Sequence, residues 1–482
     1  MENNKSIEKI PVRFKRFSFP SKCAYCSCKT RTLFSDWING KSWEHAPLPW
    51  DMSKFTMLAM LDGEYQYEIM DEKAAYRMLS QMNGIWQEIS NQDNMDKILP
   101  HLIFEEQIKY QRNVFLLYER YFYFFQFDRA RLSMPLEIKN KLGVTSEVVL
   151  ELLFRCVLLA TDDHEFFDFI KKIADNREKK FSGEGCRLIE ALSLSREEFS
   201  RRQRESLKTV GNVDVNWLAA TNLLEMYPFI TELGKTYLPN LYFLFFALTD
   251  RMLNRLTKGD NNLRSLIGKE VLEQYVYDIL QRSGCYSVIT KEKQYKVNGK
   301  ESLSPDICIE KDGEVLFLEL KLNHPSQELK KLNSCDHASL IERYVDYIVK
   351  FIQHIREREK YLLTTYAARD VYALLVLFED SMIFRSQILE QVKSHLDFKD
   401  VDSSWIYSNM HIVGLYEIEK LAYGSIDIFP LLRKWSHMEN NWNDYSIPHE
   451  GRFAWKFQTK ESICANPQNA FRHLFAKERV KQ

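Results

Sequence analysis

The stretch that decides the fold runs from Pro305 to Lys321 and reads PDICIEKDGEVLFLELK. Aliphatic runs flank the dipeptide Asp312-Gly313. This dipeptide favours a two-residue type I′ turn, because both central positions of that turn need a positive φ. We therefore predict two antiparallel strands between residues 304 and 322.

The turn also fixes which residues of the two strands face each other. Strand side chains alternate between the two faces of a sheet, so Lys321 shares the face of Glu319. Directly opposite residues point to the same face as well, which adds Asp306 to this group. The predicted cross-strand pairs are Lys311 with Glu314, Glu310 with Val315, and Asp306 with Glu319. The other, core face carries Leu316, Leu318, Leu320 and Leu322.

One face of the predicted hairpin therefore collects two carboxylates and an ammonium group. Like charges opposite each other destabilise a sheet, and a divalent cation between them removes that cost. Carboxylate oxygens suit Mg²⁺, which keeps several waters and needs only one or two protein carboxylates, and Mn²⁺ is the alternative ion. Such a cation acidifies a bound water, and a nearby lysine offsets charge that develops on a phosphate.

The motif formed by Pro305-Asp306 and Glu319-Leu320-Lys321 resembles that of the PD-(D/E)xK, or restriction-endonuclease-like, nuclease superfamily. The resemblance implies a Mg²⁺-dependent phosphodiesterase that acts on DNA. It implies that Asp306 and Glu319 bind the metal, that the backbone carbonyl of Leu320 is a further ligand, and that Lys321 assists the attacking water.

The segment before the hairpin is predicted to be a helix, from Leu266 to Gln281. Its apolar stripe consists of Ile267, Val271, Tyr275 and Ile279. Members of the superfamily often carry a glutamate on this helix that reaches the metal. Glu273 falls at the edge of the stripe whereas Glu270 points away from it, so we predict Glu273 as the further metal ligand and catalytic residue.

The neighbouring segments complete the order helix, three strands, helix, strand (αβββαβ), which is the common core of the superfamily. The first strand is predicted at Tyr286–Val297, the second helix at Ala338–Arg356, and a strand buried on both faces at Val371–Phe378. The resemblance covers residues 264 to 380. Candidates for contact with the DNA backbone, with a solvated surface as the alternative, are Lys330, Lys331, Arg343, Lys350 and Gln353. His354 is interpreted as an ordinary residue of the polar face.

The fold class is predicted to be α+β, with a largely α-helical N-terminal and middle region before an α/β restriction-endonuclease-like core. We predict a small β-containing region at 1–72, with a hairpin of Phe55–Leu61 and Glu64–Ile69. A helical scaffold or regulatory domain follows at 73–258. A linker around Gly259 leads to the nuclease domain at 259–400, and 401–482 form a C-terminal extension.

Within the scaffold, helix-period apolar residues predict four helical stretches. The last of them is interrupted at Pro228 and Pro239. After residue 378, a helix is predicted at Phe384–Leu396 and a strand that extends the sheet at His411–Ile418. The scaffold stretches are Glu72–Gln92, Phe104–Phe127, Ser146–Thr161 and Val215–Leu256.

The cysteines near the N-terminus permit two interpretations. Cys23, Cys26 and Cys28, with His45 as a fourth ligand, have the residue types of a zinc site. A structural zinc site usually has two complete ligand pairs, and the second pair is missing here. Ordinary reduced thiols are the other interpretation.

Charge and apolar runs limit the function classes. The net charge of −1 gives no bulk attraction to nucleic acid, so binding has to come from local basic patches. The longest apolar run, Leu241–Leu248, is too short to span a membrane and no signal-peptide pattern is present, so a cytoplasmic protein without membrane contact is expected. The sequence contains no nucleotide-binding P-loop motif.

These patterns favour a Mg²⁺-dependent endodeoxyribonuclease in bacterial antiviral defence or restriction. We expect a homo-oligomer that works with a defence-system partner protein. The alternative from another class is a non-catalytic nucleic-acid-binding or assembly protein that retains the nuclease fold. RNA is the alternative substrate.

Overall fold

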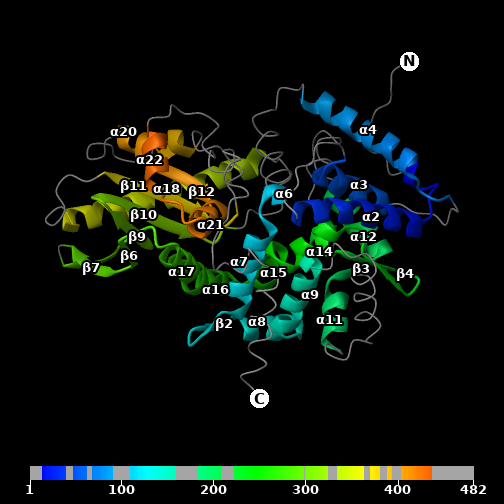
Figure 1. The fold of residues 1–482 in the computed structure, drawn as a ribbon, viewed down its shortest axis with the longest axis horizontal. Coiled ribbons are helices and arrows are strands. Elements are labelled where there is room, and N and C mark those ends of the chain that lie inside the picture. The colour runs from blue at the N-terminus through cyan, green and yellow to red at the C-terminus, as the bar shows by residue number, and fades with distance from the viewer. Residues whose placement is uncertain are drawn as a thin grey trace. The chain divides into compact units, whose positions relative to one another are not determined.

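The structure is a computed structural model, and it describes residues 13–38, 47–61, 68–90, 109–158, 183–207, 222–297, 299–323, 334–362, 370–379, 388–392 and 403–436. Among these residues the chain forms two compact units, which divide between Gly259 and Asp260 (Figure 1). Both units contain helices and strands, so the predicted α+β class is confirmed. The structure divides the chain into two units where the sequence predicted four segments.

Helices dominate the first unit. Asparagine caps begin three of them: the side chain of Asn113 accepts hydrogen bonds from the first turn of α7, and Asn240 and Asn222 do the same for α14 and η3. The helices are α2 (Phe19–Ile38), α3 (Pro49–Leu61), α4 (Glu72–Ser90), α6 (Lys109–Gln111), α7 (Val114–Gln126), α8 (Met134–Leu142), α9 (Ser146–Leu158), α11 (Glu184–Ala191), α12 (Arg196–Leu207), the 3₁₀ turn η3 (Leu223–Glu225), α14 (Leu241–Leu248) and α15 (Asp250–Thr257).

Strands in the first unit are short. β3 (Ser193–Ser195) pairs in parallel with β4 (Phe229–Glu232), which pairs antiparallel with β5 (Lys235–Tyr237). β1 (Asp128–Arg129) and β2 (Leu132–Ser133) form a separate pair. The region between Pro228 and Pro239 is therefore a β-hairpin, and the prediction of helix there was wrong. Apolar residues at 229 and 230 fit either structure, and strand pairing decides the outcome.

An aromatic cluster forms part of the core of the first unit. The rings of Phe34 and Tyr242 lie 5.0 Å apart, and those of Trp37 and Phe245 lie 5.4 Å apart, both edge to face. The indole nitrogen of Trp37 donates a hydrogen bond of 2.6 Å to the carbonyl of Arg112. The cluster joins α2 to α14.

The β-containing region predicted at 1–72 is a helical region. Phe55–Leu61, predicted as a strand, lies inside helix α3. Every residue of α3 from Met52 to Leu61 is buried, so the helix shows no polar face and its sequence lacks the helical period. Of the predicted partner strand, the structure describes residues from Glu68, where a single bridge to Phe17 is formed.

The helix predictions for the scaffold agree with the structure better than the prediction for residues 1–72 does. The predicted helix at Glu72–Gln92 is confirmed as α4, and the one at Ser146–Thr161 is confirmed as α9 up to Leu158. The predicted helix at Phe104–Phe127 is interrupted between α6 and α7.

The second unit is built on one five-stranded mixed sheet, in the order β12-β11-β10-β9-β6. β10, β11 and β12 are parallel to one another, whereas β9 and β6 run antiparallel to their neighbours. Parallel strands need a crossover, and helix α18 (Ser334–Leu362) lies between β10 and β11 in the chain. The strands are β6 (Val288–Lys291), β9 (Ile307–Lys311), β10 (Glu314–Lys321), β11 (Val371–Leu377) and β12 (Met410–Gly414).

The predicted hairpin of β9 and β10 is confirmed, with its register. Lys311 pairs with Glu314 and Glu310 with Val315. Asp312 and Gly313 have φ angles of 50° and 88°, as a type I′ turn requires. Leu316, Leu318 and Leu320 of β10 are buried, and Leu322, which follows the strand, is half-buried. Phe317 on the opposite face is also buried, so both faces of the sheet are covered.

The helix before the hairpin contains a π-helical turn. α16 (Asn261–Leu266) continues through η4 (Ile267–Leu272) into α17 (Glu273–Ser283). All four residues of the predicted apolar stripe are buried, which confirms the predicted buried face. The hydroxyl of Tyr275 donates a hydrogen bond of 2.9 Å to Glu419 on α21 (Leu415–Tyr423).

Three other predictions for the second unit need correction. The predicted strand Tyr286–Val297 is two strands, β6 and β7 (Gln294–Val297), and β7 forms a hairpin with β8 (Lys300–Leu303). The predicted strand at His411–Ile418 ends at Gly414, where α21 begins. Residues 403–436, predicted as part of an extension, belong to the second unit, where β12 extends the sheet. This segment also contains α20 (Ser403–Asn409) and α22 (Phe429–Ser436). Most of Phe384–Leu396 and all of 437–482 lie outside the described residues.

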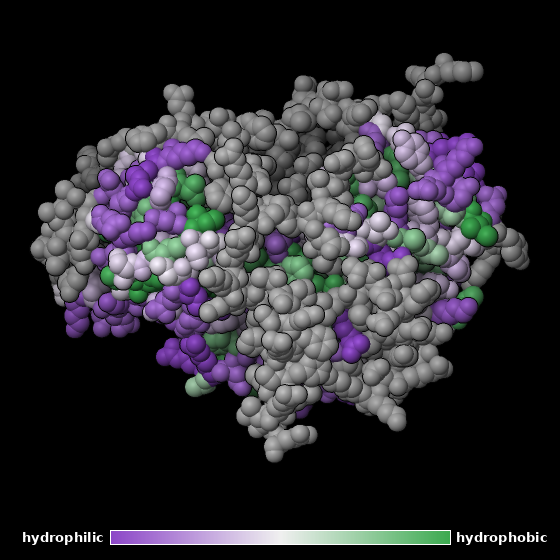
Figure 2. Space-filling view, viewed as in Figure 1, coloured by the Kyte–Doolittle hydropathy of each residue, from purple (hydrophilic) through white to green (hydrophobic). Residues whose placement is uncertain are grey.

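The surface shows hydrophilic side chains over much of the described part of one face, with small hydrophobic areas between them (Figure 2). In the part of the chain that the structure describes, no helix combines the length and apolarity that a membrane span needs.

Candidate functional site

Asp306 is fixed at the end of the β9–β10 ladder. The ladder ends with the pair Ile307 and Leu318, one step before the predicted pair of Asp306 with Glu319. Instead of a further backbone pair, the Oδ2 atom of Asp306 accepts a hydrogen bond of 2.7 Å from the backbone N–H of Leu320. The carboxylate is thus attached to the strand that carries the other two predicted site residues.

Glu319 and Lys321 form an ion pair on β10. The Nζ atom of Lys321 lies 2.7 Å from Oε1 of Glu319 and 5.5 Å from the centre of the Tyr347 ring. Burial lowers the pKa of Lys321, but the carboxylates of Glu319 and Asp306 outweigh it and raise the pKa above its ordinary value. Lys321 is therefore a permanent cation of this site at neutral pH.

His354 lies against the same carboxylate, although the sequence pattern placed it on an ordinary polar face. Its Nδ1 atom, on α18, is 4.0 Å from Oε2 of Glu319. Both atoms are buried and neither has a hydrogen-bond partner. Its interaction with Glu319 raises the pKa of His354. The fourth polar group of the site thus comes from a helix that follows β10 in the chain.

Glu273 lies close enough to these carboxylates for their charge to affect its pKa. Burial, followed by the charges of Asp306 and Glu292, raises the pKa of Glu273 to about 8. The π-helical turn η4 ends at Leu272, directly before Glu273.

The carboxyl groups have unequal affinities for protons. Burial and the charge of Glu319 raise the pKa of Asp306 to about 7. Burial also acts to raise the pKa of Glu319, but His354 and Lys321 outweigh it and hold the pKa below its ordinary value. At neutral pH the site therefore contains one firmly ionised carboxylate, an Asp306 that is about half protonated and a Glu273 that is mostly protonated, because burial and neighbouring negative charge favour the neutral acids.

The oxygen donors of this site are of the kind that a divalent cation binds. The buried Oε2 atom of Glu319 lacks a hydrogen-bond partner, and an ion bound there would supply one. The same ion would relieve the repulsion that raises the pKa of Asp306 and Glu273. Among the described residues, no three His, Cys, Asp or Glu side chains lie close enough to form a complete ligand set. Asp306 and Glu319 are two candidate ligands, and the buried Leu320 follows Glu319 directly in sequence.

A basic hairpin adjoins the carboxylates. The backbone N–H of Glu292, just before β7, donates a hydrogen bond of 2.8 Å to the carbonyl of Asp306. At the base of the hairpin, Lys293 and Ser304 exchange two hydrogen bonds, of 2.9 and 3.0 Å. Lys293, Lys296 and Lys300 are all exposed on it.

The other predicted phosphate contacts are only partly described. Arg343, Lys350 and Gln353 are exposed on α18. Lys330 and Lys331 lie outside the described residues. The exposed side chains of α18 and the hairpin are therefore the observable cationic surroundings of the site.

The N-terminal cysteines lie on helix α2. Cys23 and Cys26 are buried, whereas Cys28 is exposed. Burial raises the pKa of the Cys26 thiol to about 12 and raises that of Cys23 well above its ordinary value. The buried thiols are therefore protonated, and Cys23 contacts the sulfur of Met60 at 3.5 Å. His45 lies outside the described residues.

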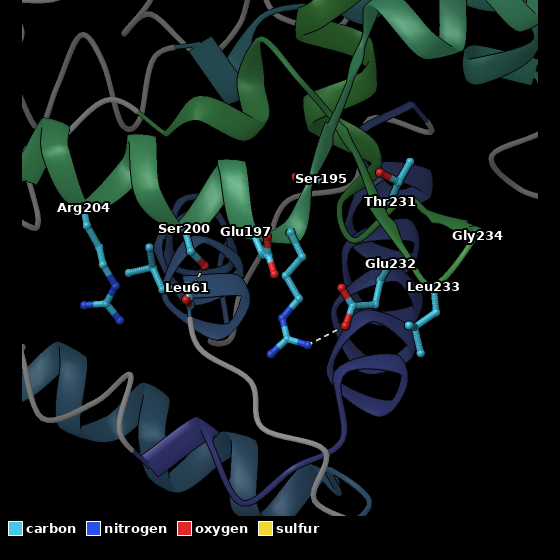
Figure 3. Close-up of a pocket in the computed structure, with 10 residues that line it drawn as sticks. Leu61, Ser195, Glu197, Ser200, Arg204, Thr231, Glu232, Leu233 and Gly234 are labelled. Carbon is cyan, nitrogen blue, oxygen red and sulfur yellow. Dashed lines mark hydrogen bonds and ion pairs between the residues drawn. The ribbon is translucent and has the colours of Figure 1, made fainter.

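A hollow of about 730 Å³ lies in the first unit, bordered by α12, β4 and the end of α3. Figure 3 shows Ser200 and Arg204 from α12 on one side and Thr231, Glu232 and Leu233 on the other. Several of its polar groups bind each other. Arg196 pairs with Glu232 at 2.8 Å, and the hydroxyl of Ser200 donates to the carbonyl of Leu61. No sequence motif had indicated this hollow, and we assign no ligand to it.

Comparison with known proteins identifies no relative of this chain. No protein-family model, curated protein or solved structure matches it. The assignment of function therefore depends on the geometry of the carboxylate site.

Proposed function

We propose that this chain is a metal-dependent endonuclease that hydrolyses phosphodiester bonds of DNA. The observation that carries the proposal is the buried cluster of Asp306, Glu319 and Lys321, in which one acid is bonded to the strand that bears the other acid and the lysine. Buried charges of one sign are costly to a fold, and a metal-ion site gives them a function.

The order of elements in the second unit supports a restriction-endonuclease-like plan. A helix is followed by β6, β9 and β10, then by α18 and β11, as the resemblance of the Asp306 and Glu319-Leu320-Lys321 motif implies. β7 and β8 are an inserted hairpin in this scheme. A fold by itself does not define an activity, so the residues of the site carry the functional argument.

In this proposal Asp306 and Glu319 hold Mg²⁺ or Mn²⁺, and the carbonyl of Leu320 and the carboxylate of Glu273 complete the protein ligands. A bound divalent ion acidifies a coordinated water and offsets charge on the scissile phosphate. Lys321 remains protonated, so it donates hydrogen bonds to the attacking water and to the phosphate oxygens. Its ion pair with Glu319 holds the ammonium beside the reacting atoms.

The substrate is proposed to be DNA, with RNA as the alternative. Because the net charge of the chain is −1, binding of a polyanion has to depend on local groups. The exposed lysines of the β7–β8 hairpin provide such groups beside the carboxylates. We also propose a role in antiviral defence or restriction, as a homo-oligomer with a partner protein in the cytoplasm. The defence role, the oligomer, the partner protein and the location all depend on the nuclease activity, so that activity has to be tested first.

Cleavage of supercoiled plasmid DNA by the purified full chain, with Mg²⁺ or Mn²⁺, tests the proposal. Lys321→Ala and Glu319→Gln are expected to lower the cleavage rate by about a hundredfold or more. Lys235→Ala removes an exposed lysine of β5 and is the matched control. Circular dichroism melting shows that each variant is folded. An RNA of similar length serves as the alternative substrate.

Three results would separate the alternatives. Cleavage by the Lys321→Ala protein at the rate of the unmodified chain would refute the site. DNA binding without cleavage by the unmodified chain, under either metal, would favour the non-catalytic alternative. Cleavage of RNA alone would keep the chemistry and change the substrate.

A further inference from the structure

Two buried atoms that have no hydrogen-bond partner face each other in the candidate site. They are Oε2 of Glu319 and Nδ1 of His354, both buried and 4.0 Å apart. Glu319 is 4 % exposed, so water does not satisfy its oxygen from the surface. Buried polar atoms are normally hydrogen-bonded, and here a protonated His354 would form only a long ion pair with Glu319, which leaves room for a bound ion between the two atoms.

The separation of the two atoms suits a shared metal ion. Ligand atoms about 2.1 Å from one ion lie about 3 Å apart at a right angle and about 4.2 Å apart on opposite sides. The observed 4.0 Å falls within this range. A direct hydrogen bond would need about 3 Å, so the pair is too far apart for that contact and close enough for a common ion.

The backbone at His354 is held in place. Its neighbours Ile352 and Ile355 are buried in the core of the second unit, at 1 % and 4 % exposure. The carbonyl of His354 accepts a hydrogen bond of 3.5 Å from the hydroxyl of Tyr295 on β7. α18 and the β7–β8 hairpin together therefore hold the backbone from which the imidazole reaches Glu319.

We infer that His354 is a nitrogen ligand of the metal in this site and that the site consequently selects Mn²⁺ over Mg²⁺. The inference rests on the proposed function, because it concerns the same ion. Imidazole nitrogen binds transition metals well, whereas Mg²⁺ prefers an all-oxygen environment. Asp306 and Glu319 alone would accept either ion, so His354 determines the preference.

Electron spin echo spectroscopy of bound Mn²⁺ tests the inference on the folded full chain, without nucleic acid. The expected signal is nuclear modulation from a directly bound imidazole nitrogen, which changes when the protein is made with ¹⁵N-labelled histidine. His354→Gln is expected to remove this signal. His411→Phe is the control, because it removes another described histidine of the second unit and keeps an aromatic contact with Trp435.

Calorimetric titration with Mn²⁺ and with Mg²⁺ supplies a second readout. His354→Gln is expected to weaken Mn²⁺ binding by about tenfold or more and Mg²⁺ binding by less than about threefold, so the preference between the ions disappears. Equal weakening for both ions would overturn the claim that His354 sets the preference. Glu319→Gln is expected to weaken binding of both.

The outcomes distinguish this inference from the proposed function. Bound Mn²⁺ that needs Glu319 but shows no nitrogen modulation would overturn the role of His354 and leave the metal site intact. Absence of Mn²⁺ binding to the unmodified chain would overturn both. The isotope experiment uses the unmodified sequence, so it decides the question even if the His354→Gln protein does not fold.

Discussion

The carboxylate of Asp306 is bonded at 2.7 Å to the backbone N–H of Leu320, the residue that separates Glu319 from Lys321. This bond holds one acid beside the other, so the two cannot move apart to reduce their repulsion. Burial and Glu319 together raise the pKa of Asp306 to about 7. In the metal-free protein, repulsion between the two carboxylates therefore lowers the free energy of unfolding, and this loss can be measured.

Asp306→Asn should stabilise the metal-free protein above neutral pH. The folded-state pKa of Asp306, about 7, is above the value of about 4 in an unfolded chain, so the folded state binds the extra proton and stability falls as pH rises through this window. Asparagine removes the charge and keeps an oxygen for the Leu320 N–H. We expect a gain on the order of 2 kcal/mol at pH 8, measured by urea denaturation.

Asp306→Ala provides the comparison. It also removes the charge, but it leaves the N–H of Leu320 without its acceptor, which costs about 1 to 3 kcal/mol. The alanine variant should therefore be less stable than the asparagine variant at every pH. Equal stability of the two variants would show that the bond to Leu320 does not contribute.

Metal binding should strengthen as pH rises. Protons compete with the ion for Asp306 and Glu273, whose pKa values are raised to about 7 and about 8. The increase in melting temperature caused by a fixed concentration of Ca²⁺ or Mn²⁺ should therefore be larger at pH 8 than at pH 6. Differential scanning fluorimetry measures it. An equal increase at both pH values would mean that the ion binds elsewhere, and Asp306→Asn should reduce the increase at pH 8.

The β7–β8 hairpin should contribute to nucleic-acid binding through one face. Alternation along the strands puts Lys293 and Lys300 on the face of Tyr295, which contacts α18 beside the site, and puts Lys296 on the other face. Replacing Lys293 and Lys300 with alanine should weaken DNA binding and lower the slope of log affinity against log salt by about two.

Lys296→Ala is the matched control for this experiment, because Lys296 is exposed on the same hairpin and points the other way. It should change the slope by less than the loss of one phosphate contact. The melting temperature shift with Mn²⁺ should be unchanged in both the double variant and Lys296→Ala. A larger effect from Lys296 would assign the binding face of the hairpin to the opposite side.

Glu225 should be essential to the stability of the first unit. It is buried, and its two oxygens pair at 2.6 Å with Lys109 and with Arg251. Burial alone would raise its pKa, but the two cations outweigh burial and lower it below the ordinary value. Glu225→Gln leaves both cations without their anion, so we expect a loss of about 3 to 5 kcal/mol in urea denaturation.

The stabilising effect of Glu225 depends on pH in the opposite direction to that of Asp306. Its folded-state pKa is lowered, so its contribution is present above about pH 4.5 and is lost as the pH falls below that value. Glu232→Gln, which disrupts the less buried pair with Arg196, serves as a control and should cost less.

Local signals explain which parts of this fold could be predicted from sequence. Asp312-Gly313 fixes a turn, the turn fixes the register, and the register brings Asp306, Glu319 and Lys321 together within seventeen consecutive residues. The sequence between β7 and β8 carries a comparable signal, Asn298-Gly299, which favours the observed hairpin over a single strand at Tyr286–Val297.

Long-range packing explains what could not be predicted. His354 reaches Glu319 from a helix that follows in the chain, and its position on that helix looks like any polar-face residue. α3 is buried on all sides, so the apolar residues of Phe55–Leu61 carry no helical period. In both cases the contact that decides the structure lies far away in sequence.

The π-helical turn at Ile267–Leu272 makes the length of this helix part of the chemistry. Such a turn accommodates one residue more than a regular helix, and each residue of an α-helix turns the chain by about 100°. Loss of that residue would let the turn relax to a regular helix with Glu273 still in phase, whereas a second inserted residue would rotate Glu273 by about 100° away from Asp306. A change in chain length would thus be enough to disrupt the site, even with every acidic residue still present.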